Sequence, residues 1–226
     1  ELARWYVQNF SLGVDLEVVA MEGWNPDQAP GYGWPQNHLS WVNPSPNAAN
    51  LSMARCYPGT VLLEGTTLSE GRGTTRPLEV VGAPDLDMPA VLAEMERLAP
   101  EWMQGCHLRP AFFEPTFHKY SGELCAAMQI HVDGKAYDHQ RFAPFKLIAL
   151  AFKSIRRLYP DYELWRDFPY EYVTDRLAID VIAGGSRLRR WVDDAEAAAG
   201  DLDGWLLTDQ QQWLDQNMAA KIYEVP

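Results

Sequence analysis

Residues 57–81 read YPGTVLLEGTTLSEGRGTTRPLEVV, two apolar runs on either side of a turn rich in glycine, hydroxyl and charged residues. The runs Thr60–Glu64 and Leu78–Val81 predict two β-strands. Glycines at positions 65, 71 and 73 permit backbone geometries in the turn that other residues avoid. Because ligands in open α/β sheets lie beyond the carboxyl ends of strands, a carboxylate at Glu64 predicts a site there.

The polar side chains of this turn are the first candidates for chemistry. They comprise two carboxylates, two guanidinium groups and two hydroxyls, at Glu64, Glu70, Arg72, Arg76, Thr66 and Ser69. The same groups also suit a turn that satisfies itself, in which both arginines pair with both glutamates and no ligand is bound. The sequence leaves both interpretations open.

Outward from the turn, hydrophobic periodicity predicts an α/β (α+β) chain. Helices are expected at 2–10, 48–55, 87–98, 142–159, 173–183, 186–198 and 208–218, and further strands at 16–20, 112–120 and 125–132. Asp87 is expected to cap its helix, and Thr208 with Gln211 forms a capping box. The longest helix is expected to cover a sheet with its apolar stripe and to carry Lys153 on its polar side. The stretch 23–46, rich in proline and tryptophan, predicts a long loop.

The composition excludes several classes of protein. A formal charge of -12 opposes binding to nucleic acid and to anionic membrane surfaces. No run of eighteen apolar residues occurs, so no membrane span is expected. The cysteines lack metal or redox spacing, and a bridge between Cys106 and Cys125 stays open. No metal-ligand spacing emerges around His118, His139 and Asp133, and no cofactor is expected.

Three segments carry a specific resemblance: Tyr57–Thr66, Ser69–Pro77 and Gly82–Pro84. Together they are similar to one contiguous block of the NamZ-type exo-β-N-acetylmuramidases. Further matches follow the family's order at Trp41–Asn47, which includes Pro44-Ser45-Pro46-Asn47, at Phe117–Val132 and at Ala183–Gly184. The resemblance therefore covers nearly the whole chain.

The resemblance implies a Rossmann-like N-terminal domain followed by a smaller mixed α/β C-terminal domain. Residues 1–77 would be the remnant of the first domain and residues 78–226 the second. Glu1–Ala3 corresponds to a motif deep inside the first domain, and the chain starts in a helical pattern without a cap, so further upstream sequence is expected. The implied activity is release of N-acetylmuramic acid from the non-reducing ends of peptidoglycan fragments, in the periplasm or outside the cell. The implied partner is a small saccharide or muropeptide substrate.

The candidate catalytic residues are carboxylates. Glycoside hydrolysis uses one carboxylic acid and a second group that activates water or attacks the anomeric carbon. Glu64 and Glu70 are the candidates, and the 2-acetamido group of the substrate can replace a protein nucleophile. An essential carboxylate upstream of residue 1 is a third alternative, and the sequence does not choose among them.

Candidate substrate-binding residues follow from the groups that the sugar carries. Arg72 or Arg76 suits the lactyl carboxylate, because a planar guanidinium matches it in shape and charge. Ser69 offers a hydroxyl, and Asn47 offers an amide to the acetamido group unless it caps the next helix. His131 lies in an apolar strand, where a place in the core competes with a role in the site.

Two other functions compete with the glycosidase. A non-catalytic carbohydrate-binding or assembly module of a cell-wall protein would use the same groups without turnover. An esterase built on Ser69 is disfavoured, because Ser69 lacks the Gly-x-Ser-x-Gly elbow.

Overall fold

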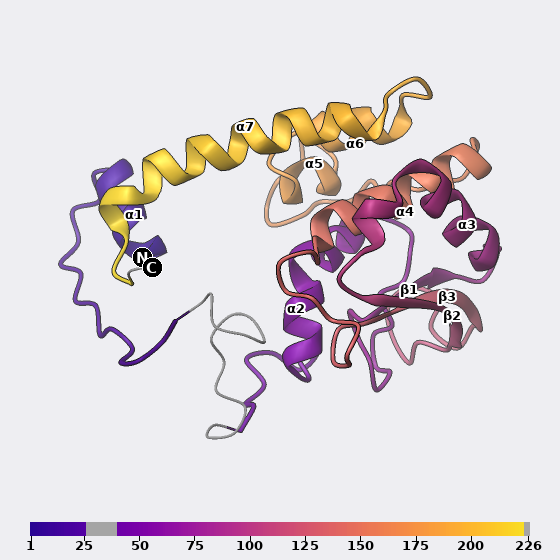
Figure 1. Cartoon of the computed structure of the whole chain (residues 1–226), viewed down its shortest axis with the longest axis horizontal. Coiled ribbons are helices and arrows are strands. Elements are labelled where there is room, and N and C mark those ends of the chain that lie inside the picture. Colours follow the sequence, from indigo (N-terminus) through magenta and orange to yellow (C-terminus); the bar gives the residue numbers. More distant parts are fainter. Residues whose placement is uncertain (26–39, 224–226) are drawn as a thin grey trace. The chain divides into compact units, whose positions relative to one another are not determined.

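A computed structural model describes residues 1–25 and 40–223 of the chain (Figure 1). The described residues form two compact units, one built from residues 1–25 and 200–223 and the other from residues 40–199.

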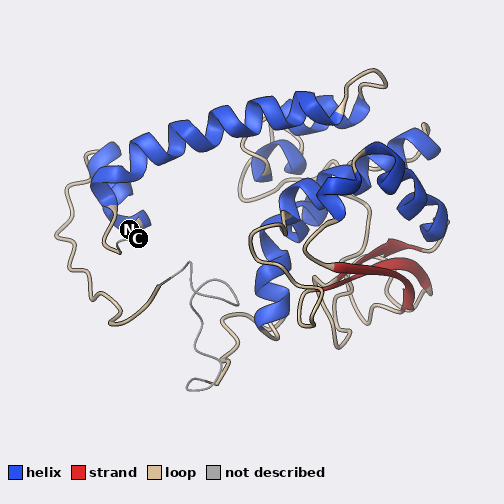
Figure 2. Cartoon of the chain, in the orientation of Figure 1, coloured by secondary structure: helices blue, strands red, loops and turns tan. Residues whose placement is uncertain are grey.

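The larger unit contains a three-stranded antiparallel sheet, red in Figure 2. Strands β1 (Val80–Ala83), β2 (His107–Phe113) and β3 (Cys125–His131) are arranged in the order β1-β3-β2. Gly82 lies opposite Ala127 in the β1–β3 ladder. A Cβ atom on Gly82 would lie 2.1 Å from the carbonyl oxygen of Ala126, so the close approach of β1 to β3 needs a glycine there.

Helices α2 (Leu51–Thr60), α3 (Met88–Leu98), α4 (Pro144–Leu158), α5 (Ala178–Ile182) and α6 (Arg187–Asp193) complete this unit, with 3₁₀ turns at Val61–Gly65 and Pro100–Met103. Helix α3 contacts β3, and α4 packs against α2, α3 and α6 (Figure 1). All residues from Leu147 to Ile155 are buried, so α4 is the centre of the core rather than a helix with one buried stripe.

Burial of α4 corrects one prediction. Lys153, expected on a polar face, is 2% exposed. Its ammonium group donates to the carbonyl oxygens of Trp191 and Asp194, which satisfy a charge that burial would otherwise destabilise.

The smaller unit contains α1 (Leu2–Asn9), α7 (Ala199–Asn217) from residue 200 onward, and a 3₁₀ turn at Met218–Ala220. The rings of Trp5 and Trp213 pack with centroids 5.1 Å apart. The carboxylate of Glu1 accepts hydrogen bonds from the backbone of Ile222 and Tyr223 at 2.8 and 3.0 Å. These contacts join the two ends of the described chain.

Several predicted elements are confirmed, among them the mixed α/β class, the helix at the start of the chain, the strand near 125–132 and the helix near 142–159. Asp87 caps α3 as expected, because its carboxylate accepts from the amide of Ala90 at 3.1 Å. The second strand of the turn region is present as β1, two residues later than predicted.

The predicted strand at 60–64 is wrong. Asn50 caps α2 by accepting from the amide of Met53 at 2.8 Å, and the helix runs to Thr60 before the 3₁₀ turn that holds Glu64. A short apolar run does not by its periodicity distinguish a strand from a buried helical segment, and here Leu62 and Leu63 are buried in helical geometry.

Other predicted boundaries are also wrong. Residues 16–20 form no strand, and β2 covers 107–113 instead of 112–120. Helices α5 and α6 are shorter than predicted. Because α7 begins at Ala199, Thr208 lies inside it and donates to the carbonyl of Gly204 instead of capping.

Residues 26–39 of the predicted long loop lie outside the described residues, and residues 40–46 contain no helix or strand. No named strand occurs among the described residues before Val80, so the Rossmann-like character of residues 1–77 stays a prediction. The division of the chain after residue 77 likewise stays a prediction.

Candidate active site

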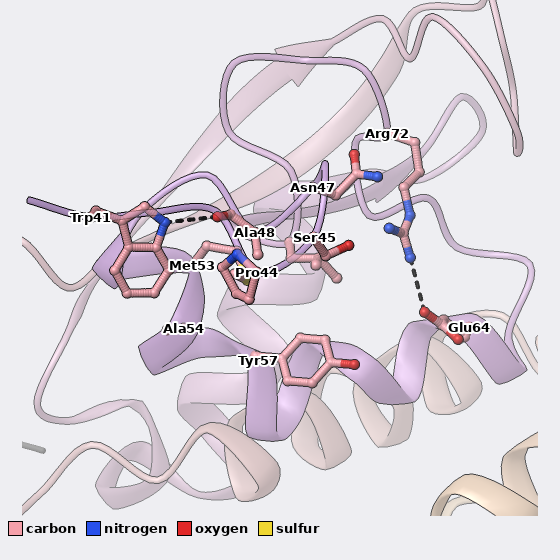
Figure 3. Close-up of a pocket in the computed structure, with 11 residues that line it drawn as sticks. Trp41, Pro44, Ser45, Asn47, Ala48, Met53, Ala54, Tyr57, Glu64 and Arg72 are labelled. Carbon is pink, nitrogen blue, oxygen red and sulfur yellow. Dashed lines mark hydrogen bonds and ion pairs between the residues drawn. The ribbon is translucent and has the colours of Figure 1, made fainter. Parts of the chain in front are cut away.

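A pocket of about 390 Å³ adjoins the turn and is called the Tyr57 pocket here (Figure 3). The loop before α2 contributes one wall, α2 contributes the floor, and the turn contributes Arg72. The lining residues are Trp41, Pro44, Ser45, Asn47, Ala48, Met53, Ala54, Tyr57, Glu64, Arg72 and Leu78. The indole of Trp41 donates to the carbonyl of Ala48 at 2.8 Å, which fixes the loop that carries Asn47 (Figure 3).

A second pocket, of about 270 Å³, is called the His118 pocket here. Its lining residues are Glu64, Arg72, Phe117, His118, Arg166, Phe168 and Tyr170. Glu64 and Arg72 line both pockets, so this ion pair stands in the wall that the two pockets share.

Both carboxylate oxygens of Glu64 have partners. The guanidinium of Arg72 donates to one at 2.9 Å (Figure 3), and the hydroxyl of Tyr170 donates to the other at 2.8 Å. Burial, followed by the bond to Glu64, raises the pKa of Tyr170 above its ordinary value, so the phenol stays a donor. The side chain of Glu64 is 27% exposed, so solvent and a ligand can reach it.

Glu70 has a different environment, because its side chain is fully buried. One oxygen accepts from Arg72 at 2.7 Å, and the other lies 2.7 Å from the ammonium nitrogen of Lys119. Burial raises the pKa of Glu70, but Lys119 and Arg72 outweigh burial and hold that pKa below its ordinary value. Glu70 lines neither the Tyr57 pocket nor the His118 pocket. The buried carboxylate of Glu70 therefore holds Arg72 in position without itself lining either pocket.

Lys119 ties this ion pair to the rest of the turn. Its ammonium group donates to the carbonyl oxygens of Leu63 and Thr66 at 2.8 and 3.2 Å. The 3₁₀ turn that carries Glu64 is thus held by the same cation that neutralises Glu70.

Ser69 joins the turn to the sheet, and Gly71 and Gly73 give the turn its shape. Ser69 is buried, and its backbone exchanges two hydrogen bonds with Gly82 of β1, at 2.8 and 3.1 Å. Gly71 and Gly73 have φ of 70° and 76°, and a Cβ on Gly73 would lie 1.7 Å from the hydroxyl oxygen of Thr116. The side-chain oxygen of Ser69 accepts from the amide of Gly71 at 3.2 Å, inside the turn.

The remaining predicted residues fall into two places. Asn47 lines the Tyr57 pocket and does not cap α2, because Asn50 takes that position. Arg76 pairs with Glu79 at 2.8 Å and lines a separate groove of about 370 Å³ beside β2.

His131, at the end of β3, accepts from Arg109 at 3.0 Å and lines neither of the two pockets that share Glu64. The structure therefore brings together Glu64, Arg72 and Asn47. It leaves Arg76 and His131 apart from them.

Sequence reasoning missed four residues of the His118 pocket: Phe117, Arg166, Phe168 and Tyr170. Phe117 begins one of the segments that resemble the family, but no motif marks the other three. These lie after α4 in the chain, and only folding brings them next to the turn. His118, considered in the sequence only for a metal, has a φ of 71°. A left-handed backbone at a residue other than glycine is strained and occurs often at functional sites.

Among residues 1–25 and 40–223, no group of three or more His, Cys, Asp or Glu side chains is arranged to hold a metal ion. In the same part of the chain, no helix is long and apolar enough to cross a membrane. Cys56, Cys106 and Cys125 are free thiols.

The fold and the pockets define a class of protein: a mixed α/β module in which aromatic rings, an amide and a carboxylate–guanidinium pair line a largely apolar cavity. The chain belongs to the NamZ family. Residues 55–223 match the family described as exo-beta-N-acetylmuramidase NamZ, C-terminal, and residues 1–52 match its N-terminal counterpart.

Among curated proteins, the chain is similar to the peptidoglycan beta-N-acetylmuramidase NamZ of Bacillus subtilis (strain 168), with 31% identity over 211 residues. That match covers 93% of this chain and 46% of the relative, so the chain spans about half the length of the relative.

Two solved structures share the fold, and both are DUF1343 family proteins of Bacteroides fragilis NCTC 9343. The first has a TM-score of 0.63 at 21% identity, and the match covers 93% of this chain and 54% of the chain in that structure. The other has a TM-score of 0.55 at 18% identity and covers 82% and 44%.

Proposed function

We propose that the protein is a glycoside hydrolase that releases N-acetylmuramic acid from the non-reducing ends of peptidoglycan fragments. Family membership and the similarity to the Bacillus peptidoglycan beta-N-acetylmuramidase support this activity. Because peptidoglycan lies outside the cytoplasmic membrane, the proposal includes a periplasmic or extracellular location. One observation of the fold carries the proposal: an accessible carboxylate, Glu64, in a wall shared by two pockets.

The two pockets suit the two sugars of a glycosidic linkage. A sugar in each pocket would place the linkage between them near Glu64, where a carboxylic acid can protonate the leaving oxygen. Trp41 and Tyr57 in one pocket and Phe117 and Phe168 in the other offer ring faces on which sugars stack.

The roles of the two predicted carboxylates differ in this proposal. Glu64 is the group that contacts the substrate, and Arg72 and Tyr170 orient it through the bonds to its two oxygens. Glu70 is a positioning residue, because its bonds go to Arg72 and Lys119 and not to a pocket. The second catalytic group is either the acetamido group of the substrate or a further carboxylate of the whole protein.

A carbohydrate-binding module without turnover is the second candidate function. The pairing of both Glu64 oxygens with Arg72 and Tyr170 favours it, since a side chain held in this way can accept hydrogen bonds from sugar hydroxyl groups without any bond being broken.

Incubation of the full-length protein with para-nitrophenyl N-acetylmuraminide separates the two functions. Nitrophenol release that disappears in Glu64→Gln, while Glu94→Gln retains it, supports the hydrolase. Saccharide binding without release supports the binding module. Turnover by Glu64→Gln at the rate of the unmodified protein would remove Glu64 from the mechanism.

A further inference from the structure

Arg166 lies in the His118 pocket and has a buried donor without a partner. Its Nη1 atom is inaccessible to solvent and makes no hydrogen bond. The protein therefore leaves this guanidinium incompletely paired where the residue lines the pocket. Within residues 1–25 and 40–223, no carboxylate lies within ion-pair distance of Arg166.

The guanidinium of Arg166 is nevertheless held in place. It lies over the ring of Phe168, with its central carbon 4.2 Å from the ring centroid. The backbone amide of Arg166 donates to the carbonyl of Gly65 at 3.1 Å, next to Glu64. The cation is thus positioned beside the candidate catalytic carboxylate before any ligand arrives.

The other two candidate arginines are already paired with carboxylates. Arg72 binds Glu64 and Glu70, and Arg76 binds Glu79 and Asp133. Glu70 is also neutralised by Lys119. The charges that surround the His118 pocket therefore balance except for Arg166, with the imidazole of His118 as a further group that becomes cationic at low pH.

We infer that Arg166 binds a carboxylate of the ligand in the His118 pocket. The inference rests on the proposed function for the choice of ligand, because N-acetylmuramic acid differs from N-acetylglucosamine by an acidic lactyl ether. A planar guanidinium with free donors matches that group in geometry and charge. Arg166 then selects N-acetylmuramic acid over the neutral sugar, and the His118 pocket holds the residue to be released.

The two sources of a carboxylate are separable with three probes. N-acetylmuramic acid carries the lactyl carboxylate. In N-acetylmuramyl-L-alanyl-D-isoglutamine that group is an amide and the carboxylate lies on the peptide. N-acetylglucosamine has no carboxylate and serves as the neutral control.

Binding of each probe to the full-length protein is measured by calorimetry for the unmodified protein, Arg166→Gln, Arg166→Lys and the control Arg141→Gln. Arg141 is an exposed arginine whose ion-pair partner is Asp138, and it lines none of the pockets described above. Arg166→Gln is expected to bind N-acetylmuramic acid about 10–150-fold more weakly, because a hydrogen bond to a charged group is worth about 1.5–3 kcal/mol. Arg166→Lys retains part of the affinity, and N-acetylglucosamine binds equally to all four proteins.

Equal loss of affinity for the neutral sugar, or equal binding of N-acetylmuramic acid to the unmodified protein and Arg166→Gln, overturns the inference. If only the peptide-bearing probe responds to Arg166, the bound carboxylate is that of the peptide. Nitrophenol release is assayed on the same proteins. Turnover without an Arg166 effect on binding refutes this inference alone, whereas Arg166-dependent binding without turnover refutes only the hydrolase.

Discussion

Replacement of the buried carboxylate in Glu70→Gln is expected to destabilise the protein strongly, whereas Glu64→Gln is not. In Glu70→Gln the ammonium of Lys119 stays buried without an anion, and Arg72 loses one of its two carboxylates. Removal of one partner from a buried ion pair costs about 3–5 kcal/mol. Glu64 is 27% exposed, so its loss is expected to cost about 1 kcal/mol or less.

Thermal melting measures the difference. For a chain of this size, a loss of 3–5 kcal/mol lowers Tm by about 6–20 °C. The control is Glu94→Gln, because Glu94 forms ion pairs with Arg97 and Arg157, whose side chains are exposed to solvent. A Glu70→Gln protein that melts within about 2 °C of the unmodified protein would refute the buried ion pair as the anchor of the turn.

The pH dependence of stability provides a second assay of the same residue. The pKa of Glu70 in the folded protein lies below its ordinary value of 4.5. A carboxyl whose pKa is lower in the folded state binds fewer protons there, so it stabilises the fold above pH 4.5 and loses that contribution as pH falls through the folded pKa. The stability of Glu70→Gln is therefore expected to vary less with pH in this acid range than that of the unmodified protein.

Three further predictions follow from the same region and from the thiols. Gly73→Ala is expected to lower the free energy of unfolding, measured in urea, by about 2 kcal/mol or more, since the φ of 76° disfavours a side chain and the new Cβ would meet Thr116. An unchanged free energy of unfolding would contradict the left-handed backbone of Gly73 and its close contact with Thr116. Tyr170→Phe removes one bond to Glu64, so kcat on the nitrophenyl sugar is expected to fall about tenfold with little change in Tm, and an unchanged kcat would contradict the orienting role. Desolvation raises the pKa of the half-buried Cys106 thiol to about 12, so its alkylation by iodoacetamide at pH 8 is expected to be slow, and rapid labelling would contradict the raised pKa.

Local signals predicted the elements whose cause is local. Asp87 caps α3 through its own neighbours, and the long amphipathic pattern of α4 exceeds any strand in length. The predicted strand at 60–64 is wrong because α2, capped by Asn50, ends at Thr60 and leads directly into the 3₁₀ turn Val61–Gly65, and burial of Leu62 and Leu63 is compatible with either geometry. Only tertiary packing decides whether such a short apolar run forms a strand or a helical turn.

The same division applies to the candidate site. The glycine-punctuated turn indicated where charged groups gather, and Glu64, Arg72 and Asn47 do line one pocket. The sequence did not reveal that Glu70 is buried and paired with Lys119, because the residue type alone does not show whether a glutamate is buried or exposed.

The sequence by itself determined the family, the mixed α/β class and the segment that carries the charged groups, since all three reside in residue types and their spacing. Only the tertiary structure decided which carboxylate is accessible, and it brought Arg166 and Tyr170 to the turn from beyond α4. Accessibility and charge balance depend on distances between residues that are far apart in the chain, and those distances arise only when the core closes around α4.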